Sequence, residues 1–222
     1  MPDQRDPRFT AGLLNLTDAG RFLRVPQPTF HRWAKGYMRG EPLIHIKPMT
    51  VGELPVTFTA LAEGYVLDAL RAAGVRPQKI RPALLRLRQE FGEYALVARE
   101  LATDGIDVLW DYAQTPAGHE LIEGRTGQVV IREIVADYMR YVARDEEGYP
   151  EELQLRNWEP SKVVVDMHRA FGQPIFAGSG ARVAAVAGLM RAGEDAETAA
   201  DEFGVSIEDA RTAARILLGH AA

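Results

Sequence analysis

Two prolines one residue apart, Pro26 and Pro28, divide the first forty residues into two short helices. The residue before a proline is pushed out of the helical region, which ends a first helix over residues 16–23. Pro28 fits the first turn of a second helix, because the N–H that it lacks would have no partner there. Thr17 is the expected N-cap of the first helix, and Gly36 is the expected end of the second.

Helical spacing gives the second helix one apolar face and one polar face. Residues at positions i, i+3, i+4 and i+7 form an apolar stripe, which we expect in the core and not stacked on bases: Phe30, Trp33, Ala34 and Tyr37. The polar and basic residues fall on the opposite side: Gln27, His31, Arg32, Lys35 and Arg39.

The charge of this region differs from that of the whole chain. No acidic residue stands between Asp18 and Glu41, while five basic residues do. Residues 1–47 hold 8 basic and 4 acidic residues, a net charge of +4, although the 222-residue chain has a net charge of −5. Residues 100–159 hold 5 basic and 14 acidic residues, a net charge of −9. A basic start and an acidic middle favour a polyanionic partner at one end and another partner elsewhere.

The pattern predicts a helix-turn-helix that binds duplex DNA. It consists of two short helices with a brief connection, and the second helix has one apolar face for the core and one basic face for solvent. Arg, Lys, Gln and Thr side chains hydrogen-bond base edges or phosphates. The alternative is an ordinary helical hairpin with a solvated basic face. The predicted DNA-binding residues are Thr17, Arg24, Gln27, Thr29, His31, Arg32, Lys35, Arg39 and Lys47.

After this pair, the pattern predicts a small β-wing and several helices. The wing consists of strands at 43–47 and 53–58, with Lys47 near its tip. Helices are expected at 59–73, 78–91 (interrupted or kinked by Pro82), 94–103 and 132–143, and a hairpin at 120–131. A second acid-free basic stretch, residues 71–88, fits either phosphate contacts or a solvated helix face.

The acidic segment 145–160, with two prolines and a glycine, is the predicted linker to a tail unit. Strands at 162–166 and 173–178, a helix at 181–193 and a second helix-turn-helix at 197–218 are expected there. Gly204 stands at its turn, Ser206 caps its last helix, and Glu208 and Asp209 follow. Phosphate would repel these acids, and the tail holds more apolar side chains than a domain of about 60 residues readily buries: Ala184, Val186, Leu189, Met190, Phe203, Ile216 and Leu217. We therefore expect residues 161–222 to mediate self-association, with toxin binding as the alternative.

The predicted fold is mainly α. A winged helix-turn-helix domain with small β elements and a helical extension spans residues 1–157, and a small helical domain with a second helix-turn-helix spans 158–222. The sequence has no cysteine, no apolar run of membrane-spanning length and no signal peptide. It has no catalytic motif. We therefore expect a cytoplasmic protein that is not an enzyme and needs no cofactor or metal; GSGAR (178–182) and DGID (104–107) are interpreted as turns.

Two stretches resemble known families. LTDAGRFLRVPQPTFHRW and AAGVRPQKIRPALLRLRQEFG are similar to the opening helices and the later helix pair of MerR-like winged helix-turn-helix domains. The tail, VVVDMHRAFGQPIFAGSGARVAAVAGLMRAGEDAETAADEFGVSIEDA, is similar to a small helix-turn-helix domain common in bacterial antitoxins. The combination covers nearly the whole chain and resembles VapB-type antitoxins of type II VapBC toxin–antitoxin systems.

This resemblance implies a homodimer that binds double-stranded operator DNA, represses its own operon and neutralises a cognate PIN-domain ribonuclease toxin. The reading helix of the family corresponds to residues 27–35 here. Two alternatives stay open at this point. One is a MerR-like regulator that responds to a small organic ligand through residues 94–143, and the other is an adaptor that binds only proteins.

Overall fold

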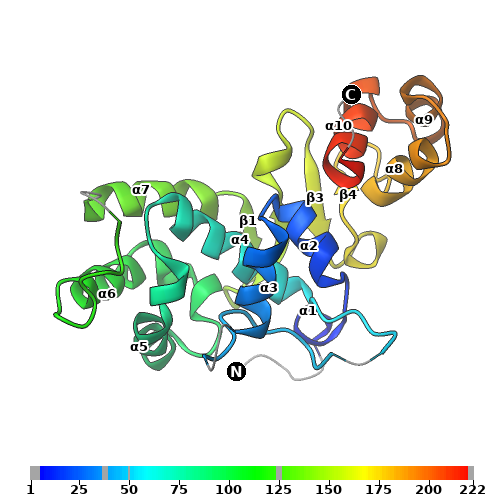
Figure 1. Cartoon of the computed structure of the whole chain (residues 1–222). Helices are drawn as coiled ribbons and strands as arrows, with labels where there is room; N and C mark the ends of the chain where they lie inside the picture. The colour runs from blue at the N-terminus through cyan, green and yellow to red at the C-terminus, as the bar shows by residue number, and fades with distance from the viewer. Residues whose placement is uncertain (1–5, 37–39, 50, 124–126, 220–222) are drawn as a thin grey trace. The chain divides into compact units, whose positions relative to one another are not determined.

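The computed structural model describes residues 6–36, 40–49, 51–123 and 127–219. Its fold is mainly helical, as predicted, with one small antiparallel sheet (Figure 1). The chain forms two compact units that interleave along the sequence. Unit 1 comprises residues 1–30, 47–58 and 151–222, and unit 2 comprises residues 31–46 and 59–150. The predicted domains, 1–157 and 158–222, therefore follow a different division, and their independence stays a prediction.

The helices follow one another along most of the chain. The first half holds α1 (Pro7–Thr10), α2 (Leu16–Leu23), α3 (Gln27–Lys35), α4 (Phe58–Ala72) and α5 (Arg81–Phe91). The rest of the chain holds α6 (Asp104–Ala113), α7 (Gln128–Met139), α8 (Val183–Arg191), α9 (Ala196–Phe203) and α10 (Ile207–Leu218). Short 3-10 turns are η1 (Pro77–Lys79), η2 (Ala95–Val97), η3 (Arg99–Ala102), η4 (Arg156–Trp158) and η5 (Ala170–Gly172). Among the described residues, no helix is long and apolar enough to cross a membrane.

The sheet has the strand order β1-β2-β3-β4, formed by Val142–Arg144, Pro150–Gln154, Val163–Asp166 and Ile175–Phe176. Leu153 lies opposite Val165, and Val164 lies opposite Ile175, in antiparallel register. β3 and β4 confirm the two strands expected in the tail.

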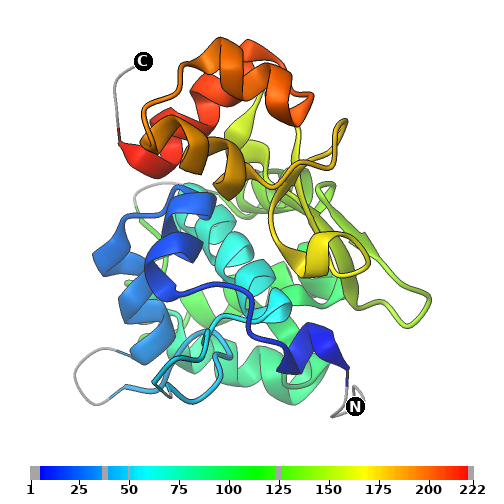
Figure 2. The same cartoon turned by 90° about the vertical axis from the view of Figure 1, so that its right-hand side faces the viewer.

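In unit 1, the helices α8, α9 and α10 pack together, and α10 also packs on α2 (Figure 2, orange to red and blue). Gly204, in the left-handed conformation with φ 62°, makes the turn between α9 and α10. Ser206 caps α10 through a capping box with Asp209. The second helix-turn-helix pattern is therefore confirmed in its turn and in its cap.

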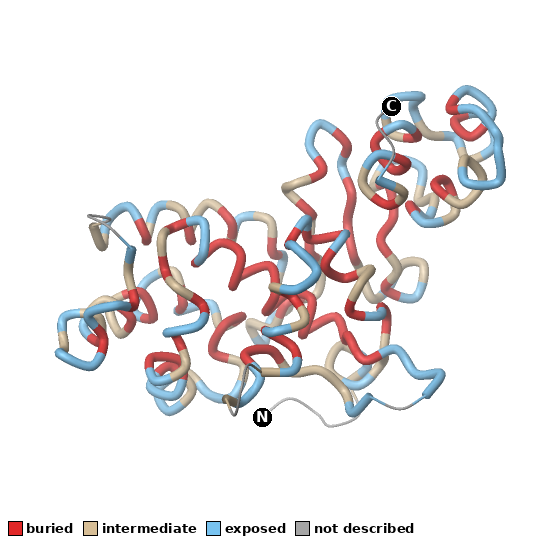
Figure 3. Tube along the Cα trace, in the orientation of Figure 1, coloured by how far each residue is buried: buried red, intermediate tan, exposed pale blue. Residues whose placement is uncertain are grey.

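Unit 2 is built around α4, which is buried along nearly its whole length (Figure 3). α5 packs on α6, and α6 packs on α7. The backbone N–H of Arg76 donates to the carbonyl of Leu121 at 2.8 Å and ties the end of α4 to a distant loop.

Several predicted elements of the middle region are wrong. No strands form in 43–47 or 53–58 among the described residues; the segment is a loop in which the Lys47 N–H donates to the Pro55 carbonyl at 2.8 Å. Lys47 is thus at the neck of that loop and not at the tip of a wing. The helix expected at 78–91 is interrupted, as one of the two expected outcomes, since η1 ends at Lys79 and α5 begins at Arg81; Pro82 lies in the first turn of α5 and produces no kink.

The remaining corrections concern helix starts and the linker. DGID (104–107) is the first turn of α6 and not a loop, and the helix expected at 94–103 consists of 3-10 turns. The predicted hairpin at 120–131 is wrong because α7 already begins at Gln128; Gly124, Arg125 and Thr126 lie outside the described residues. The predicted linker at 145–160 contains β2 and the fully buried Trp158.

Candidate nucleic-acid interface

The first helix-turn-helix begins with a side-chain cap on α2. The amide oxygen of Asn15, and not the predicted Thr17, accepts a hydrogen bond from the Asp18 N–H at 2.8 Å. At the other end, the N–H of Val25 donates to the Gly20 carbonyl at 2.9 Å. A Cβ at Gly20 would lie 3.3 Å from the Val25 carbonyl oxygen, so the tight turn favours glycine there.

A remote segment holds the end of α2. The indole N–H of Trp158 donates to the Phe22 carbonyl at 2.8 Å, and the two rings stack with centroids 5.7 Å apart. The Asn157 amide donates to the Leu23 carbonyl at 3.1 Å, and Arg24 donates to the Asn157 carbonyl at 3.0 Å. These contacts satisfy the carbonyl groups that the end of a helix leaves without partners.

Arg24 itself adopts the left-handed conformation, with φ 55°. This conformation is unfavourable for residues other than glycine, asparagine and aspartate. Arg24 is exposed, and its side chain is held at this position by the hydrogen bond to Asn157, 133 residues distant in sequence.

The second helix of the pair, α3, has the two faces that helical spacing predicts. Its apolar face is buried, with Phe30 at 0%, Trp33 at 3% and Ala34 at 1% exposure. These values confirm that Phe30 and Trp33 are core residues; Tyr37 lies outside the described residues. Gln27, Arg32 and Lys35 are exposed, and none of the residues of α3 is acidic.

Two of the predicted DNA-binding residues contact each other. The amide of Gln27 donates to the Thr17 hydroxyl at 3.0 Å, which connects α2 with the start of α3. Thr29 is half-buried, and its N–H donates to the Pro26 carbonyl at 2.8 Å. The structure therefore presents Gln27 and Arg24 to solvent in defined orientations.

The other predicted residues differ in exposure. His31 is half-buried, and its Nε2 is buried without a hydrogen-bond partner among the described residues, so this atom is not presented to solvent. The Lys47 ammonium lies 3.8 Å from the Glu53 carboxylate. Arg39 lies outside the described residues. Within α3 itself, the exposed cations are thus Arg32 and Lys35.

Asn157 and Trp158 position this site, and the sequence did not reveal them. Both lie in a segment whose acidic residues, prolines and glycine favoured a linker. The signal that could have found them is the tryptophan, because a large aromatic residue is unusual in a solvated linker.

The second basic stretch, residues 71–88, is largely engaged in contacts within unit 2. Arg71 pairs with Asp68 at 2.7 Å, and Arg76 pairs with Glu123 at 2.9 Å. The Lys79 ammonium lies 2.5 Å from Glu120, and its hydrogen bond and charge hold the pKa of that carboxyl below its ordinary value. These pairs favour the interpretation of the stretch as a solvated helix face.

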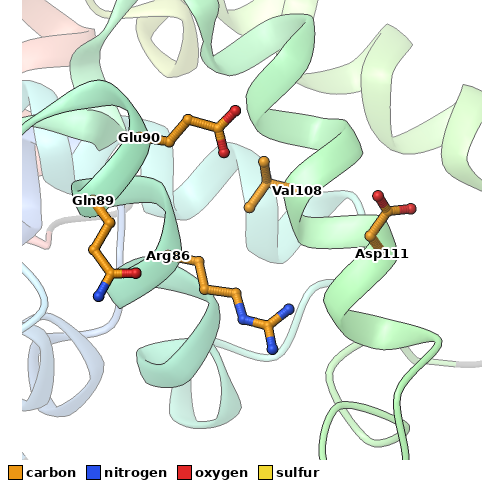
Figure 4. A pocket seen from close by; sticks show the side chains of 5 residues that line it. All are labelled: Arg86, Gln89, Glu90, Val108 and Asp111. Atoms are coloured by element: carbon orange, nitrogen blue, oxygen red, sulfur yellow. The ribbon is translucent and has the colours of Figure 1, made fainter.

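A shallow depression of about 490 Å³ lies between α5 and α6 (Figure 4). Its lining is mostly polar: Arg86, Gln89, Glu90, Val108 and Asp111. Since small-molecule sites are usually concave and mostly apolar, this lining gives little support to an organic ligand. The ligand-responsive regulator stays an untested alternative. No group of three or more potential metal ligands occurs within the described part of the chain.

Comparisons with known proteins match this arrangement. Residues 12–84 match a family described as a putative DNA-binding HTH domain, and residues 163–215 match a family described as a protein of unknown function, DUF433. The helix-turn-helix of α2 and α3 lies inside the first match. The helices α8 to α10, with all but the last three residues of α10, lie inside the second.

Full-length relatives extend the match over nearly the whole chain. A crystal structure of Rv2018 from Mycobacterium tuberculosis has a TM-score of 0.76 and 36% identity, and covers 93% of this chain and 99% of its own. A protein of the same organism, named "Putative antitoxin VapB45", is 38% identical over 93% of this chain and 94% of its own length. The resemblance to VapB-type antitoxins is therefore confirmed, and the chain belongs to the family of the VapB45 antitoxin.

Proposed function

We propose that this protein is a non-enzymatic antitoxin of the cytoplasm that binds operator DNA as a homodimer and represses its own operon. Its toxin partner would be a PIN-domain ribonuclease, which it neutralises by binding. The observation that carries the DNA-binding part is the exposed, acid-free face of α3, which begins at a tight turn and is backed by buried aromatic residues.

The exposed residues of α3 suit a duplex. Arginine and lysine pair with guanine edges or phosphates, and glutamine pairs with adenine edges. The bond from Gln27 to Thr17 fixes the Gln27 amide before binding, so less entropy is lost when it meets a base. We assign a phosphate contact to Arg24, which is exposed at the turn. Thr29, Arg39 and Lys47 complete the proposed set of DNA contacts, together with His31, whose contact would use atoms other than the buried Nε2.

The toxin part of the proposal rests on the family. The relative that is 38% identical is named as an antitoxin, and an antitoxin acts by binding its toxin. Co-expression with the product of the neighbouring gene tests this part. We expect a stable complex in which the ribonuclease activity of that product is suppressed; a neighbouring product that has ribonuclease activity and stays active and separate would contradict it.

The DNA-binding part is tested by the double variant Arg32→Ala, Lys35→Ala. Both side chains are exposed, so the variant should fold as the wild type does. We expect weaker binding to the upstream DNA, by about 1–3 kcal/mol for each lost base contact, or a salt slope reduced by about one unit for each lost phosphate contact. Fluorescence anisotropy at several salt concentrations measures both.

The matched control is Arg140→Ala, which removes a cation that is 80% exposed and lies at the end of α7. This control should bind DNA with the affinity of the wild type. If the double variant and the control bind equally well, α3 is not the reading helix. Loss of binding in the control as well would indicate a nonspecific effect of net charge.

A further inference from the structure

The turn between β3 and β4 exposes an aromatic side chain. Phe171 is 91% exposed, and its backbone is left-handed with φ 55°, next to Ala170 with φ 47°. Both residues carry a Cβ, for which this conformation is unfavourable. A backbone strained in this way, at a site that also leaves a large apolar ring in solvent, is typical of a binding position.

Local contacts hold this turn rigid. The N–H of Gly172 donates to the Arg169 carbonyl at 3.0 Å, and that of Gln173 donates to the Ala170 carbonyl at 3.1 Å. The Gln173 amide also donates to the Leu13 carbonyl at 2.8 Å. The ring of Phe171 is therefore presented on a fixed backbone, which reduces the entropy lost on binding.

The same unit contains a groove that would accept an aromatic ring. Its volume is about 320 Å³. Six of the eleven residues that line it are apolar, namely Leu13, Leu14, Phe22, Leu54, Ala184 and Leu217, and the other five are Asn15, Asp18, Arg21, Gln173 and Arg191. Gln173, two residues after Phe171, also lines it and donates to the carbonyl of Leu13, another lining residue, so the turn that carries the ring adjoins the groove on one unit.

The groove and the turn that carries the ring hold charges of opposite sign. Asp18 and Arg21 line the groove and pair with each other at 3.4 Å. Arg191, which also lines it, is exposed and has no carboxylate partner among the described residues. Asp166, at the base of the turn that carries Phe171, accepts a hydrogen bond from the His168 N–H at 2.8 Å and has no cationic partner within the described part of the chain. A second copy would bring opposite charges to both positions.

We infer that Phe171 of one copy inserts into this groove of a second copy, and that the second copy returns the same contact. Because the ring and the groove adjoin, a two-fold axis can pair each ring with the opposite groove and close the assembly as a dimer. Arg191 then faces Asp166 of the other copy. The inference deepens the proposed function, since two reading helices one turn of DNA apart require a dimer.

Point variants of the full chain test the inference better than a truncation, because Trp158 and α10 pack on α2. Phe171→Gly removes the ring and relieves the strained backbone. Ala184→Trp fills the exposed edge of the groove. We expect each variant to raise the dimer dissociation constant by about tenfold or more, as expected for loss of an interface hot spot, without lowering the melting temperature of the monomer.

The matched control is Val129→Ser, which removes an apolar side chain that is 67% exposed on α7 of unit 2. Light scattering with size-exclusion chromatography, without DNA, should show an unchanged dimer for this control. A monomeric wild type, or both variants with the dissociation constant of the wild type, would overturn the inference. The proposed DNA contacts of α3 are measured separately and can stand if this interface fails.

A disulfide test gives a second and independent outcome. The sequence has no cysteine, so chains with Phe171→Cys and chains with Ala184→Cys each carry a single thiol. After mixing and mild oxidation, we expect a disulfide-linked pair of the two different chains. If the yield of mixed pairs does not exceed that of a mixture of Val129→Cys and Ala184→Cys chains, Phe171 does not occupy the groove of the second copy.

Discussion

The two helix-turn-helix pairs of this protein have similar local construction and different surfaces. α2 is capped by Asn15 and ends in a left-handed residue, Arg24, with φ 55°. α9 is capped by Asp195 and ends in a left-handed residue, Gly204, with φ 62°. The second pair uses the residue that tolerates this conformation, whereas the first keeps an arginine in it.

The difference in charge lies in the second helix of each pair. α3 has no acidic residue in its first turn, while α10 has Glu208 and Asp209 there. Asp209 completes the capping box of α10. Its negative charge stabilises the start of the helix, and the same charge would repel a DNA phosphate. The two pairs therefore share helix-turn-helix geometry and differ in the charge of the first turn of their second helix, and this difference is the ground on which we propose DNA binding for α3 and not for α10.

The pairs differ also in what stabilises them. The end of α2 depends on Trp158, which is distant in sequence and fully buried. The α9–α10 pair has side-chain caps of its own and packs on α8, its neighbour in sequence, and α10 also packs on α2. Four predictions would break or sharpen this comparison.

The largest expected effect is a loss of stability on removal of Trp158, which is distant in sequence and holds the end of α2. Trp158→Ala should lower the free energy of unfolding by about 3–5 kcal/mol, since it removes a buried indole and its hydrogen bond to Phe22. Urea denaturation measures the loss. Amide exchange should increase more in α2 than in α10; equal increases in both helices would show that the two pairs do not differ in their supports.

Arg24→Gly gives the turn after α2 the same left-handed residue type, glycine, that follows α9 at Gly204. Relief of the left-handed strain and loss of the bond to the Asn157 carbonyl act in opposite directions, so the unfolding free energy should stay within about 1 kcal/mol of the wild type. The salt slope of DNA binding should fall by about one unit. An unchanged slope would show that Arg24 is retained for structure and not for DNA.

Ser206→Ala should destabilise the protein by about 1 kcal/mol, because the hydroxyl that accepts the Asp209 N–H at 3.0 Å is lost. DNA affinity should not change, because α10 is not a reading helix in this proposal. Thermal unfolding and anisotropy measure the two quantities. A matching loss of DNA affinity would assign the second pair to the DNA interface.

The smallest effect concerns pH. Hydrogen bonds from Thr198, chiefly from its backbone N–H, hold the pKa of Asp195 below its ordinary value. A lowered pKa in the folded state means that this cap stabilises α9 above the ordinary aspartate pKa of about 3.9, and that the stabilisation is lost as the pH falls through the folded value. Asn15, which caps α2, does not titrate.

Asp195→Asn replaces the titrating cap with the type of cap that α2 has. The difference in melting temperature between the wild type and this variant should therefore shrink as the pH falls from about 5 towards 3. Asn15→Asp, the reverse exchange on α2, is the matched control and should introduce a pH dependence. A difference that stays constant over this range would contradict a role of the Asp195 charge.

The sequence was sufficient to predict the elements that are specified by residues close together in the chain. The spacing of Phe30, Trp33 and Ala34 gave the buried face of α3, and Gly204 with Ser206 gave the second turn and its cap. It was not sufficient where local signals were ambiguous. The apolar and β-branched residues of 43–47 fit a strand, yet Leu43 and Ile44 are buried in a loop because the Leu43 N–H bonds the Trp33 carbonyl.

By itself, the sequence determined the α2–α3 helix-turn-helix, the charge of its exposed face and the family, because caps, helical periodicity and motifs depend on residues a few positions apart. Only the tertiary structure decided that Trp158 supports α2, that Arg24 bonds Asn157, and that Phe171 stands exposed on a strained turn near an apolar groove. These features join residues far apart in the chain, and their energies arise from packing and backbone geometry, for which no short-range pattern exists.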